Sequence, residues 1–469
     1  MSCPDDNDSD THPQSPPAAP DRISTAPPEV FDDEAFSNEP PAGPHGDQAT
    51  SMTAYVGEFA HRLLSSFNDF PSRKVEEWWN NISPTLAIFM DATGYNIHVQ
   101  YNYLRFFRDY VYPSLGKPPR RDRVITWPST VAPMFIPASL GLRRQDGDDI
   151  LRFSYEPINS RAGTLLDPYN SYALSSALDL LKSGGVLFNT DLYYQFKHDL
   201  TLSNDEDGFL GSAPVPEYQL SRYILTLNMR NNFSGPSLDC CLSPFLKSVV
   251  TGVPASKLVF DTIRMADTPR ALIADALSVV TEYWENCNND TKDAYLLGWE
   301  MVEPSRASIK VYFAEWEVQY ERVKEFFTLG NTLQSHPPTA TALADVWELW
   351  RAFEIKVGNR KVVKQDDDAD LSESLPRSPL LFCFELVPGN PDPKLTVYLP
   401  VDGISCARIA SILENVYTRF NWKDLKRPYR VCLDHAFNHE DMHTWISYEF
   451  HPEKGPMINA ILQPMREYP

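Results

Sequence analysis

Cationic and tyrosine side chains recur at alternate positions of several short β-rich runs. Lys310 and Tyr312 alternate with apolar residues in one run, and Arg152 and Tyr398 do so in two others. Because successive side chains of a β-strand point to opposite faces, each of these residues shares a face with other polar side chains. Arginine and lysine are cationic, and all three residue types donate hydrogen bonds.

The two faces of these runs differ in character. One face is apolar, and the other mixes single charges with Tyr, Cys, Trp and Ser. An antiparallel sheet with one solvated side is the common explanation of such a pattern. The alternative is a sheet that closes on itself, with helices over the apolar face and the polar face lining an internal chamber. The pattern alone leaves both open.

The β-rich runs come in pairs, with helical patterns between the pairs. The runs are residues 150–158, 222–230, 237–245, 294–302, 308–316, 380–387, 394–401, 443–450 and 456–463. Helical periodicity covers residues 52–115, 175–185, 268–287, 342–358 and 404–422. Pairs of strands followed by helices favour antiparallel hairpins with helical connections over parallel βαβ units.

The composition limits the class of protein. The chain has 469 residues, of which 42% are apolar, and a formal net charge of −21. This acidity opposes nucleic-acid backbones and anionic lipid, so we expect neither a nucleic-acid nor a membrane partner. The N-terminus lacks the pattern of a signal peptide, and no apolar run approaches the roughly 18 residues of a membrane span. We therefore expect a cytoplasmic protein.

Residues 1–50 differ from the rest of the chain. They hold ten of the 40 prolines and eleven acidic residues, with Arg22 as the one arginine or lysine. Such a segment cannot bury enough apolar surface to offset its conformational entropy. We expect a disordered acidic, proline-rich tail at 1–50 and one folded domain at 51–469.

Two clusters have residue types that ligate metals. The aspartates of residues 366–370 stand among polar residues with no apolar helical face, which favours a solvated loop. His435, His439 and His443 are four residues apart, but they lead into a strand and lack the HExxH order, which favours a surface loop or short helix. The seven cysteines fit no zinc spacing. We expect no metal site.

Six segments carry a resemblance to a known family, in order and in spacing. They are LRFSYEPINSRAGTLLDPYN (151–170), SKLVFDTIR (256–264), LLGWEMVEPSRASIKVYF (296–313), VKEFFTLGNTL (323–333), LLFCFELVPGNPDPKLTVYLPV (380–401) and HTWISYEFHPEKGPMINAILQP (443–464). Together they resemble the fungal dimethylallyltryptophan-synthase-type aromatic prenyltransferases. The resemblance implies an α/β fold of the ABBA type, a single antiparallel ten-stranded β-barrel surrounded by α-helices.

The resemblance also implies a reaction. In that family, cations hold a prenyl diphosphate, tyrosines shield the allyl cation, an indole or phenol attacks it, and a glutamate accepts the proton. Preorganised cations stabilise the departing diphosphate, and a closed chamber excludes water from the allyl cation. The chain would thus be a prenyltransferase of secondary metabolism, with a prenyl diphosphate and a small aromatic acceptor as partners and no metal or other cofactor. Whether it is a monomer or a homodimer stays open.

Four residues match the family's substrate-binding positions. The resemblance implies that Arg152 and Lys310 bind diphosphate oxygens, and that Tyr312 and Tyr398 donate to phosphate and line the cation. Glu156 belongs to the family's EPI tripeptide, for which we expect a structural role.

Six positions depart from the family pattern. Ser308 stands where the family has an arginine, and Asp239 and Cys241 stand where it has a lysine and a tyrosine. The other three are Thr396 for glutamine or lysine, Ile461 for tyrosine, and Ser139 for the proton-accepting glutamate. The catalytic base is therefore unidentified.

These departures support an alternative function. Charge-assisted hydrogen bonds are worth roughly 1.5–3 kcal/mol each, so two lost cations weaken diphosphate binding by several kcal/mol. A cyclase or isomerase of the same fold could act without diphosphate on a prenylated or polyketide-derived substrate. Arg152, Lys310 or Asp239 would then protonate or orient that substrate. A non-catalytic copy of the fold is a third hypothesis.

Overall fold

The computed structural model describes most of the chain between residues 58 and 466. The described residues are 58–119, 127–132, 135–203, 206, 210, 220–232, 234–267, 270–287, 290–330, 337–360, 378–437 and 442–466. The predicted tail at 1–50 and the aspartates of 366–370 lie outside these residues.

Ten antiparallel strands form a closed barrel. They are β1 (Ala138–Arg144), β2 (Ile150–Tyr155), β3 (Tyr223–Met229), β4 (Ser237–Leu242), β5 (Lys292–Glu300), β6 (Ile309–Glu315), β9 (Leu380–Leu386), β10 (Lys394–Pro400), β11 (His443–His451) and β12 (Gly455–Leu462). The first and last strands close the barrel, with Arg143 opposite Asn459. The predicted ten-stranded barrel is confirmed, and the alternative of a sheet with one solvated side is wrong.

The nine β-rich runs of the sequence all contain barrel strands, and each hairpin joins neighbouring strands. The tenth strand, β1, was expected only from the resemblance. Its sequence ASLGLRR contains small residues and two adjacent arginines, so the alternation of apolar and polar residues is weak.

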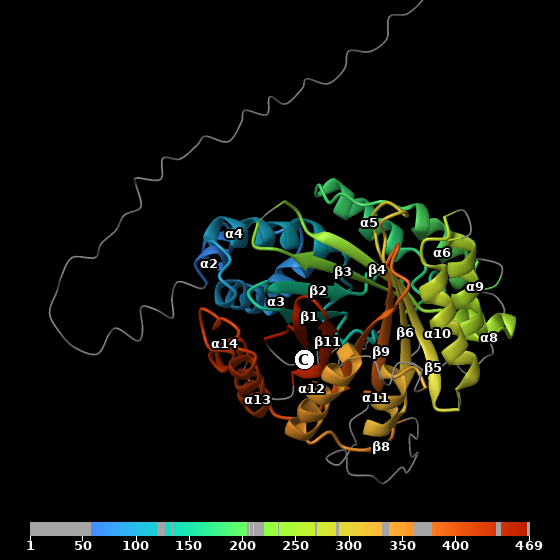
Figure 1. The fold of residues 1–469 in the computed structure, drawn as a ribbon. Helices are drawn as coiled ribbons and strands as arrows, with labels where there is room; N and C mark the ends of the chain where they lie inside the picture. The colour runs from blue at the N-terminus through green and yellow to red at the C-terminus, as the bar shows by residue number, and fades with distance from the viewer. Residues whose placement is uncertain are drawn as a thin grey trace, which may run out of the picture. The chain divides into compact units, whose positions relative to one another are not determined.

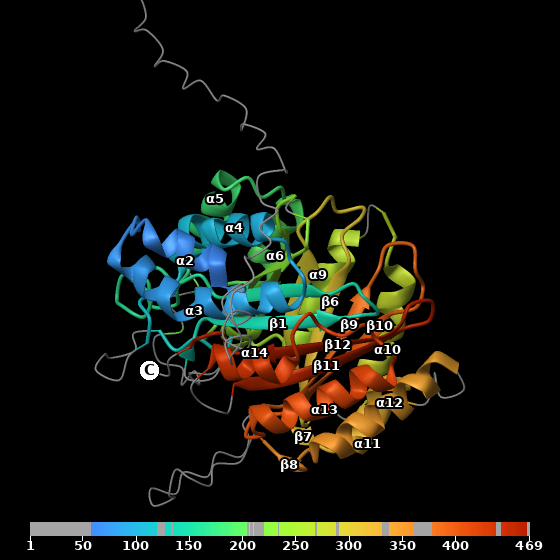
Figure 2. The same cartoon turned by 90° about the vertical axis from the view of Figure 1, so that its left-hand side faces the viewer.

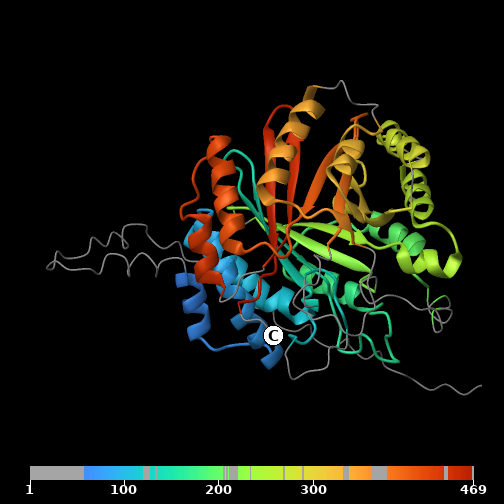
Figure 3. The same cartoon turned by 90° about the horizontal axis from the view of Figure 1, so that it is seen from below.

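Helices form a layer on the outer side of the strands (Figures 1 and 3). They are α2 (Phe59–Ser66), α3 (Arg73–Ala92), α4 (Ile97–Phe106), α5 (Ala173–Ser183), α6 (Asp191–Leu200), α8 (Phe245–Thr251), α9 (Ala255–Asp267), α10 (Ala274–Asn286), α11 (Tyr320–Phe327), α12 (Pro337–Phe353), α13 (Cys406–Arg419) and α14 (Tyr429–Ala436). Figure 2 shows α12 and α13 beside β11. In the described part of the chain, no helix combines the length and the apolar character of a membrane span.

The hydrophobic core lies between the strands and the helices. Aromatic pairs join the two layers: Phe153–Phe107, Trp299–Phe196, Phe313–Trp284 and Phe382–Phe326, with ring centroids 4.8, 5.0, 4.3 and 3.8 Å apart. Each pair combines one ring of a strand with one ring of the outer layer. Such contacts stabilise the fold by more than the buried area alone provides. Because the apolar side of each strand faces outward, the polar side is left for the interior of the barrel.

Glu156 holds the chain where it leaves β2. Its side chain is fully buried and accepts hydrogen bonds from Trp127 Nε1 (2.8 Å), Ser129 Oγ (2.6 Å) and Ser221 Oγ (2.7 Å). Burial raises the pKa of Glu156 to about 7, although these donors favour the carboxylate. The three hydrogen bonds to neighbouring segments favour the expected structural role.

The raised pKa of Glu156 predicts a dependence of stability on pH. Its ordinary pKa is 4.5, so between pH 4.5 and about 7 the folded protein binds more protons than the unfolded chain. The free energy of unfolding should therefore fall as the pH rises through this range, by up to roughly 3 kcal/mol from this group. Urea unfolding at both ends of the range measures it. In Glu156→Gln the fall should be smaller by that amount, and an unchanged fall would contradict the assignment.

Candidate active site

The interior of the barrel, its lumen, is lined by the polar faces of the strands. In the register of the barrel, Arg152 of β2 lies opposite Gly141 of β1 and Asn228 of β3. Lys310 of β6 lies opposite Gly298 and Glu385. The closed barrel therefore turns these polar faces toward one another.

Near the end of the barrel where its hairpins turn, each strand contributes a polar side chain to a ring. In barrel order this polar ring consists of Arg143, Arg152, Asn228, Asp239, Glu300, Lys310, Glu385, Lys394, Glu449 and Asn459. It contains four cationic and four carboxylate side chains, and their formal charges sum to zero. A ring of this composition differs from one built to hold a polyanion by positive charge alone.

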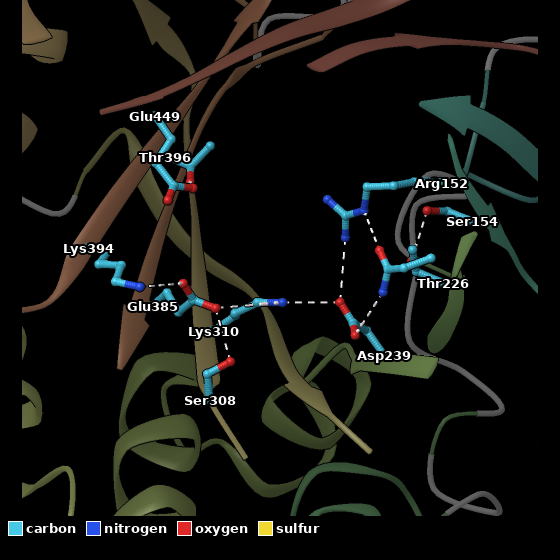
Figure 4. Close-up of polar contacts among 11 residues, drawn as sticks. Arg152, Ser154, Thr226, Asp239, Ser308, Lys310, Glu385, Lys394, Thr396 and Glu449 are labelled. Carbon is cyan, nitrogen blue, oxygen red and sulfur yellow. Dashed lines mark hydrogen bonds and ion pairs between the residues drawn. The ribbon is translucent and has the colours of Figure 1, made fainter. Parts of the chain in front are cut away.

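Asp239 lies between the two predicted diphosphate-binding cations (Figure 4). Its Oδ2 atom is 3.0 Å from Lys310 Nζ and 3.5 Å from Arg152 Nη2. Asn228 completes the arrangement, because it accepts from Arg152 Nε at 2.8 Å and donates to Asp239 Oδ1 at 3.2 Å. The structure thus brings Arg152 and Lys310 together, but with a carboxylate of the protein between them.

Glu385 extends this network across the lumen (Figure 4). Its Oε1 atom accepts from Ser308 Oγ at 2.9 Å and lies 3.8 Å from Lys310 Nζ. Its Oε2 atom lies 3.9 Å from Lys394 Nζ. Ser308, one of the altered positions, therefore supports a carboxylate of the ring and supplies no positive charge.

The carboxylates keep the two central cations charged. Burial lowers the pKa of Lys310, but Asp239 and Glu385 outweigh it, so the pKa lies above its ordinary value. Burial also opposes the charge of Arg152, and Asp239 again outweighs it and raises the pKa. Both side chains are therefore cations whether or not a ligand is present.

An aromatic layer adjoins the polar ring along the barrel axis. The rings of Tyr312 and Tyr398 have centroids 6.2 Å apart. Tyr398 also contacts a small cluster of buried apolar side chains that includes Leu381 and Trp316. Burial raises the pKa of both tyrosines, so they are neutral phenols. Their π-faces can stabilise a cation without capturing it.

The remaining altered positions also lie on the lumen side of their strands; they are Ser139, Cys241, Thr396 and Ile461. Thr396 donates from Oγ1 to Glu449 Oε2 at 2.8 Å. Ser139 lies opposite Ser154 in the register of β1 and β2. Gly141, and not Ser139, is the β1 residue directly opposite Arg152.

Seven residues of the polar ring are not predicted as site residues from the sequence: Arg143, Asn228, Glu300, Glu385, Lys394, Glu449 and Asn459. Within the described ranges, neither Arg143 nor Glu449 has an oppositely charged group within 4.0 Å. Burial and then Glu385 raise the pKa of Glu449. The alternation that identifies Tyr398 could have found Glu449, because Glu449 shares a face with Ser447 in the run 443–450.

His435 and His443, the two described histidines of the three, have different surroundings. His435 is exposed in α14, whereas His443 is buried at the start of β11. The Nε2 atom of His443 is 2.8 Å from the hydroxyl oxygen of Tyr429. The surface position expected for His443 is therefore wrong, and His439 lies outside the described residues. Among the residues that the structure describes, no group of three or more His, Cys, Asp or Glu side chains could hold a metal ion.

The fold and sequence are similar to those of known proteins. The chain is 28% identical over 432 residues to "Tryptophan dimethylallyltransferase" from Claviceps fusiformis, which covers 88% of this chain and 93% of the relative. It is 27% identical to "Reverse prenyltransferase criA" from Aspergillus cristatus, over 88% of this chain and 96% of the relative.

Solved structures share the barrel. AnaPT from Neosartorya fischeri superposes with a TM-score of 0.75 at 21% identity, over 87% of this chain and 100% of that chain. NotF in complex with brevianamide F and DMSPP superposes with a TM-score of 0.75 at 23% identity, over 88% and 100%.

A family model described as tryptophan dimethylallyltransferase matches residues 74–431. This range holds eight of the ten barrel strands and the Arg152, Asp239, Lys310 and Glu385 network. The predicted resemblance and the predicted class of transferase are confirmed by this match. The chain belongs to the tryptophan dimethylallyltransferase family.

Proposed function

We propose that the protein transfers a prenyl group from a prenyl diphosphate to a small aromatic acceptor inside the barrel. The observation that carries this proposal is that Arg152, Lys310, Tyr312 and Tyr398 face one lumen. The relatives support it, because two of their names specify a dimethylallyltransferase and a prenyltransferase, and the NotF structure contains an acceptor and DMSPP.

The chemistry divides between the two layers of the lumen. As the carbon–oxygen bond of the prenyl diphosphate breaks, the diphosphate keeps the electron pair, and cations of the lumen such as Arg152 stabilise it. Tyr312 and Tyr398 face the allyl cation until an atom of the acceptor forms the new bond and the acceptor loses its proton. The closed wall restricts the access of water to the cation. Since side chains supply the positive charge, the proposal includes no metal or other cofactor.

One domain carries this proposed site. Every residue of the polar ring and of the aromatic layer lies between Arg143 and Asn459. We propose that residues 51–469 are the catalytic domain and that residues 1–50 are an acidic extension with no part in the chemistry.

Turnover and ligand-induced stabilisation test the proposed function. The full chain should form a prenylated product from dimethylallyl diphosphate with L-tryptophan or brevianamide F, detected by mass spectrometry. A ligand at 100 times its Kd should also stabilise the fold by about 2.7 kcal/mol, measured as a rise in Tm. If no product forms and Tm does not rise at millimolar dimethylallyl or geranyl diphosphate, prenyl transfer is contradicted.

The position of Asp239 favours a second candidate, a cyclase or isomerase that uses no diphosphate. Asp239 already supplies a negative charge to both Arg152 and Lys310, which is what a diphosphate would otherwise do. An enclosed aromatic chamber could still fold a flexible substrate into a reactive shape. This candidate predicts no stabilisation by any prenyl diphosphate, so the experiment above separates the two.

A further inference from the structure

Arg143 is a cation of the lumen without a counter-ion. Leu142 and Arg144 beside it face the helices, where Arg144 Nη2 donates to the Lys423 carbonyl at 2.6 Å, so alternation turns Arg143 inward. In the described part of the chain, no carboxylate lies within 4.0 Å of Arg143, and its Nε atom is buried without a hydrogen-bond partner. Arg143 as a whole is half-buried, but its buried Nε–H group is unfavourable unless something supplies the missing acceptor.

Arg152 stands beside Arg143 on the same wall. It lies opposite Gly141, two residues before Arg143, so the two arginines are diagonal neighbours on the inner face of β1 and β2. Arg152 uses Nε and Nη2 for Asn228 and Asp239, and the structure gives Nη1 no partner among the described residues. Figure 4 shows a terminal nitrogen of Arg152 that points away from Asp239. Two guanidinium groups therefore present unused donors to the same region.

Asn459 adds a second unsatisfied group at this place. It lies opposite Arg143 on β12, is 4% exposed, and its Oδ1 atom is buried without a partner. Gly141 makes room for this amide, because a Cβ atom there would come within 2.7 Å of Asn459 Oδ1. Arg143 Nε lacks an acceptor, which an anionic ligand can supply, and Asn459 Oδ1 lacks a donor, which a water beside that ligand can supply.

The other ring cations are already neutralised. Lys310 lies within 4.0 Å of two carboxylates, and Lys394 lies 3.9 Å from Glu385. Asp239 fills the space between Arg152 and Lys310, so a polyanion meets a carboxylate there. On the side of Arg143, the nearest acidic influences are Glu449 and Asp148, and both lie beyond ion-pair distance.

We propose that Arg143, together with Arg152, forms the subsite that takes the diphosphate group of the substrate, on the wall of β1 and β2. This inference rests on the proposed function and deepens it, because it places the leaving group away from the position between Arg152 and Lys310. The guanidinium groups bind phosphate oxygens through charge-assisted hydrogen bonds, which their fixed geometry favours.

The test is calorimetric titration of the full chain with inorganic pyrophosphate. Arg143→Gln should weaken pyrophosphate binding about 10- to 100-fold. Lys394→Gln is the matched control, because it removes a ring cation that already has a carboxylate partner, and it should change the affinity less than about threefold. The Tm of ligand-free Arg143→Gln should equal or exceed that of the wild type, since no partner is lost. A residue with a purely structural role would lower it.

Each result decides a separate point. If the wild type binds pyrophosphate and Arg143→Gln changes that affinity by less than about threefold, the subsite is overturned and the proposed function stands. No binding of pyrophosphate to the wild type at millimolar concentration would overturn the proposed function, and the subsite with it. A parallel titration with L-tryptophan tests whether the anion that Arg143 binds is instead the carboxylate of the acceptor. If Arg143→Gln weakens only tryptophan binding, Arg143 binds the acceptor's carboxylate, and the diphosphate assignment is overturned.

Discussion

Asp239→Asn should bind inorganic pyrophosphate about 10- to 100-fold more tightly than the wild type. The substitution keeps the size of the side chain but removes the charge that lies 3.0 Å from Lys310 and 3.5 Å from Arg152. Both cations then need an external anion, and a charge-assisted hydrogen bond is worth roughly 1.5–3 kcal/mol. Without ligand the variant should have a lower Tm than the wild type, because two cations lose their partner. Titration calorimetry and thermal unfolding with and without pyrophosphate measure both effects.

Glu449→Gln is the control for Asp239→Asn. It also removes a carboxylate from the polar ring, but Glu449 has Thr396 as its hydrogen-bond donor and no cation within 4.0 Å in the described residues. Long-range repulsion alone should change the affinity for pyrophosphate by less than about threefold. An equal gain in the two variants would show that net charge, and not the contact of Asp239 with Arg152 and Lys310, limits the affinity.

Lys310→Met should reduce the free energy of unfolding by about 2–4 kcal/mol. Removal of one partner from a buried ion pair is strongly destabilising, because the remaining charge is left uncompensated. Lys310 has two such partners, Asp239 at 3.0 Å and Glu385 at 3.8 Å, and its side chain is 15% exposed. The exposure of the network to the lumen keeps the expected loss below the upper end for buried pairs. Chemical denaturation measures the loss.

The double variant Asp239→Asn with Lys310→Met tests the cause of that loss. If the lone carboxylate destabilises the single variant, neutralising Asp239 should recover part of the stability, and a double-mutant cycle gives the coupling. Simple addition of the two losses would show that Lys310 stabilises the barrel through its packed methylene groups and not through its charge.

Much of the barrel is predictable because alternation is a local property. The sequence of each β-rich run alone shows which side chains share a face, as Lys310 and Tyr312 do. Neighbouring runs are long enough to pair as hairpins. Whether the polar faces meet water or one another depends on closure, and closure depends on the contact between β1 and β12. The residues that make this contact are more than 300 positions apart, so local patterns could not decide it.

The site was predictable in composition but not in connectivity. Alternation and the family resemblance identify Arg152, Lys310, Tyr312 and Tyr398 as lumen residues, and the resemblance marks Asp239 as a departure. Asp239 contacts both cations because of the register between β2, β6 and the strands that lie between them. Local patterns do not fix this register, since Arg152 and Asp239 are 87 residues apart. That Arg143 and Glu449 have no ion pair within 4.0 Å among the described residues depends on how distant strands pack, which alternation does not contain.

The pairing of β1 with β12 also governs how the protein is made. During synthesis β1 leaves the ribosome more than 300 residues before its partner, so the nascent chain carries an unpaired strand edge until translation is almost complete. A premature stop codon before Gly455 would leave β1 and β11 each with one unpaired edge. We therefore expect such truncated chains to aggregate or be degraded and to retain no partial activity.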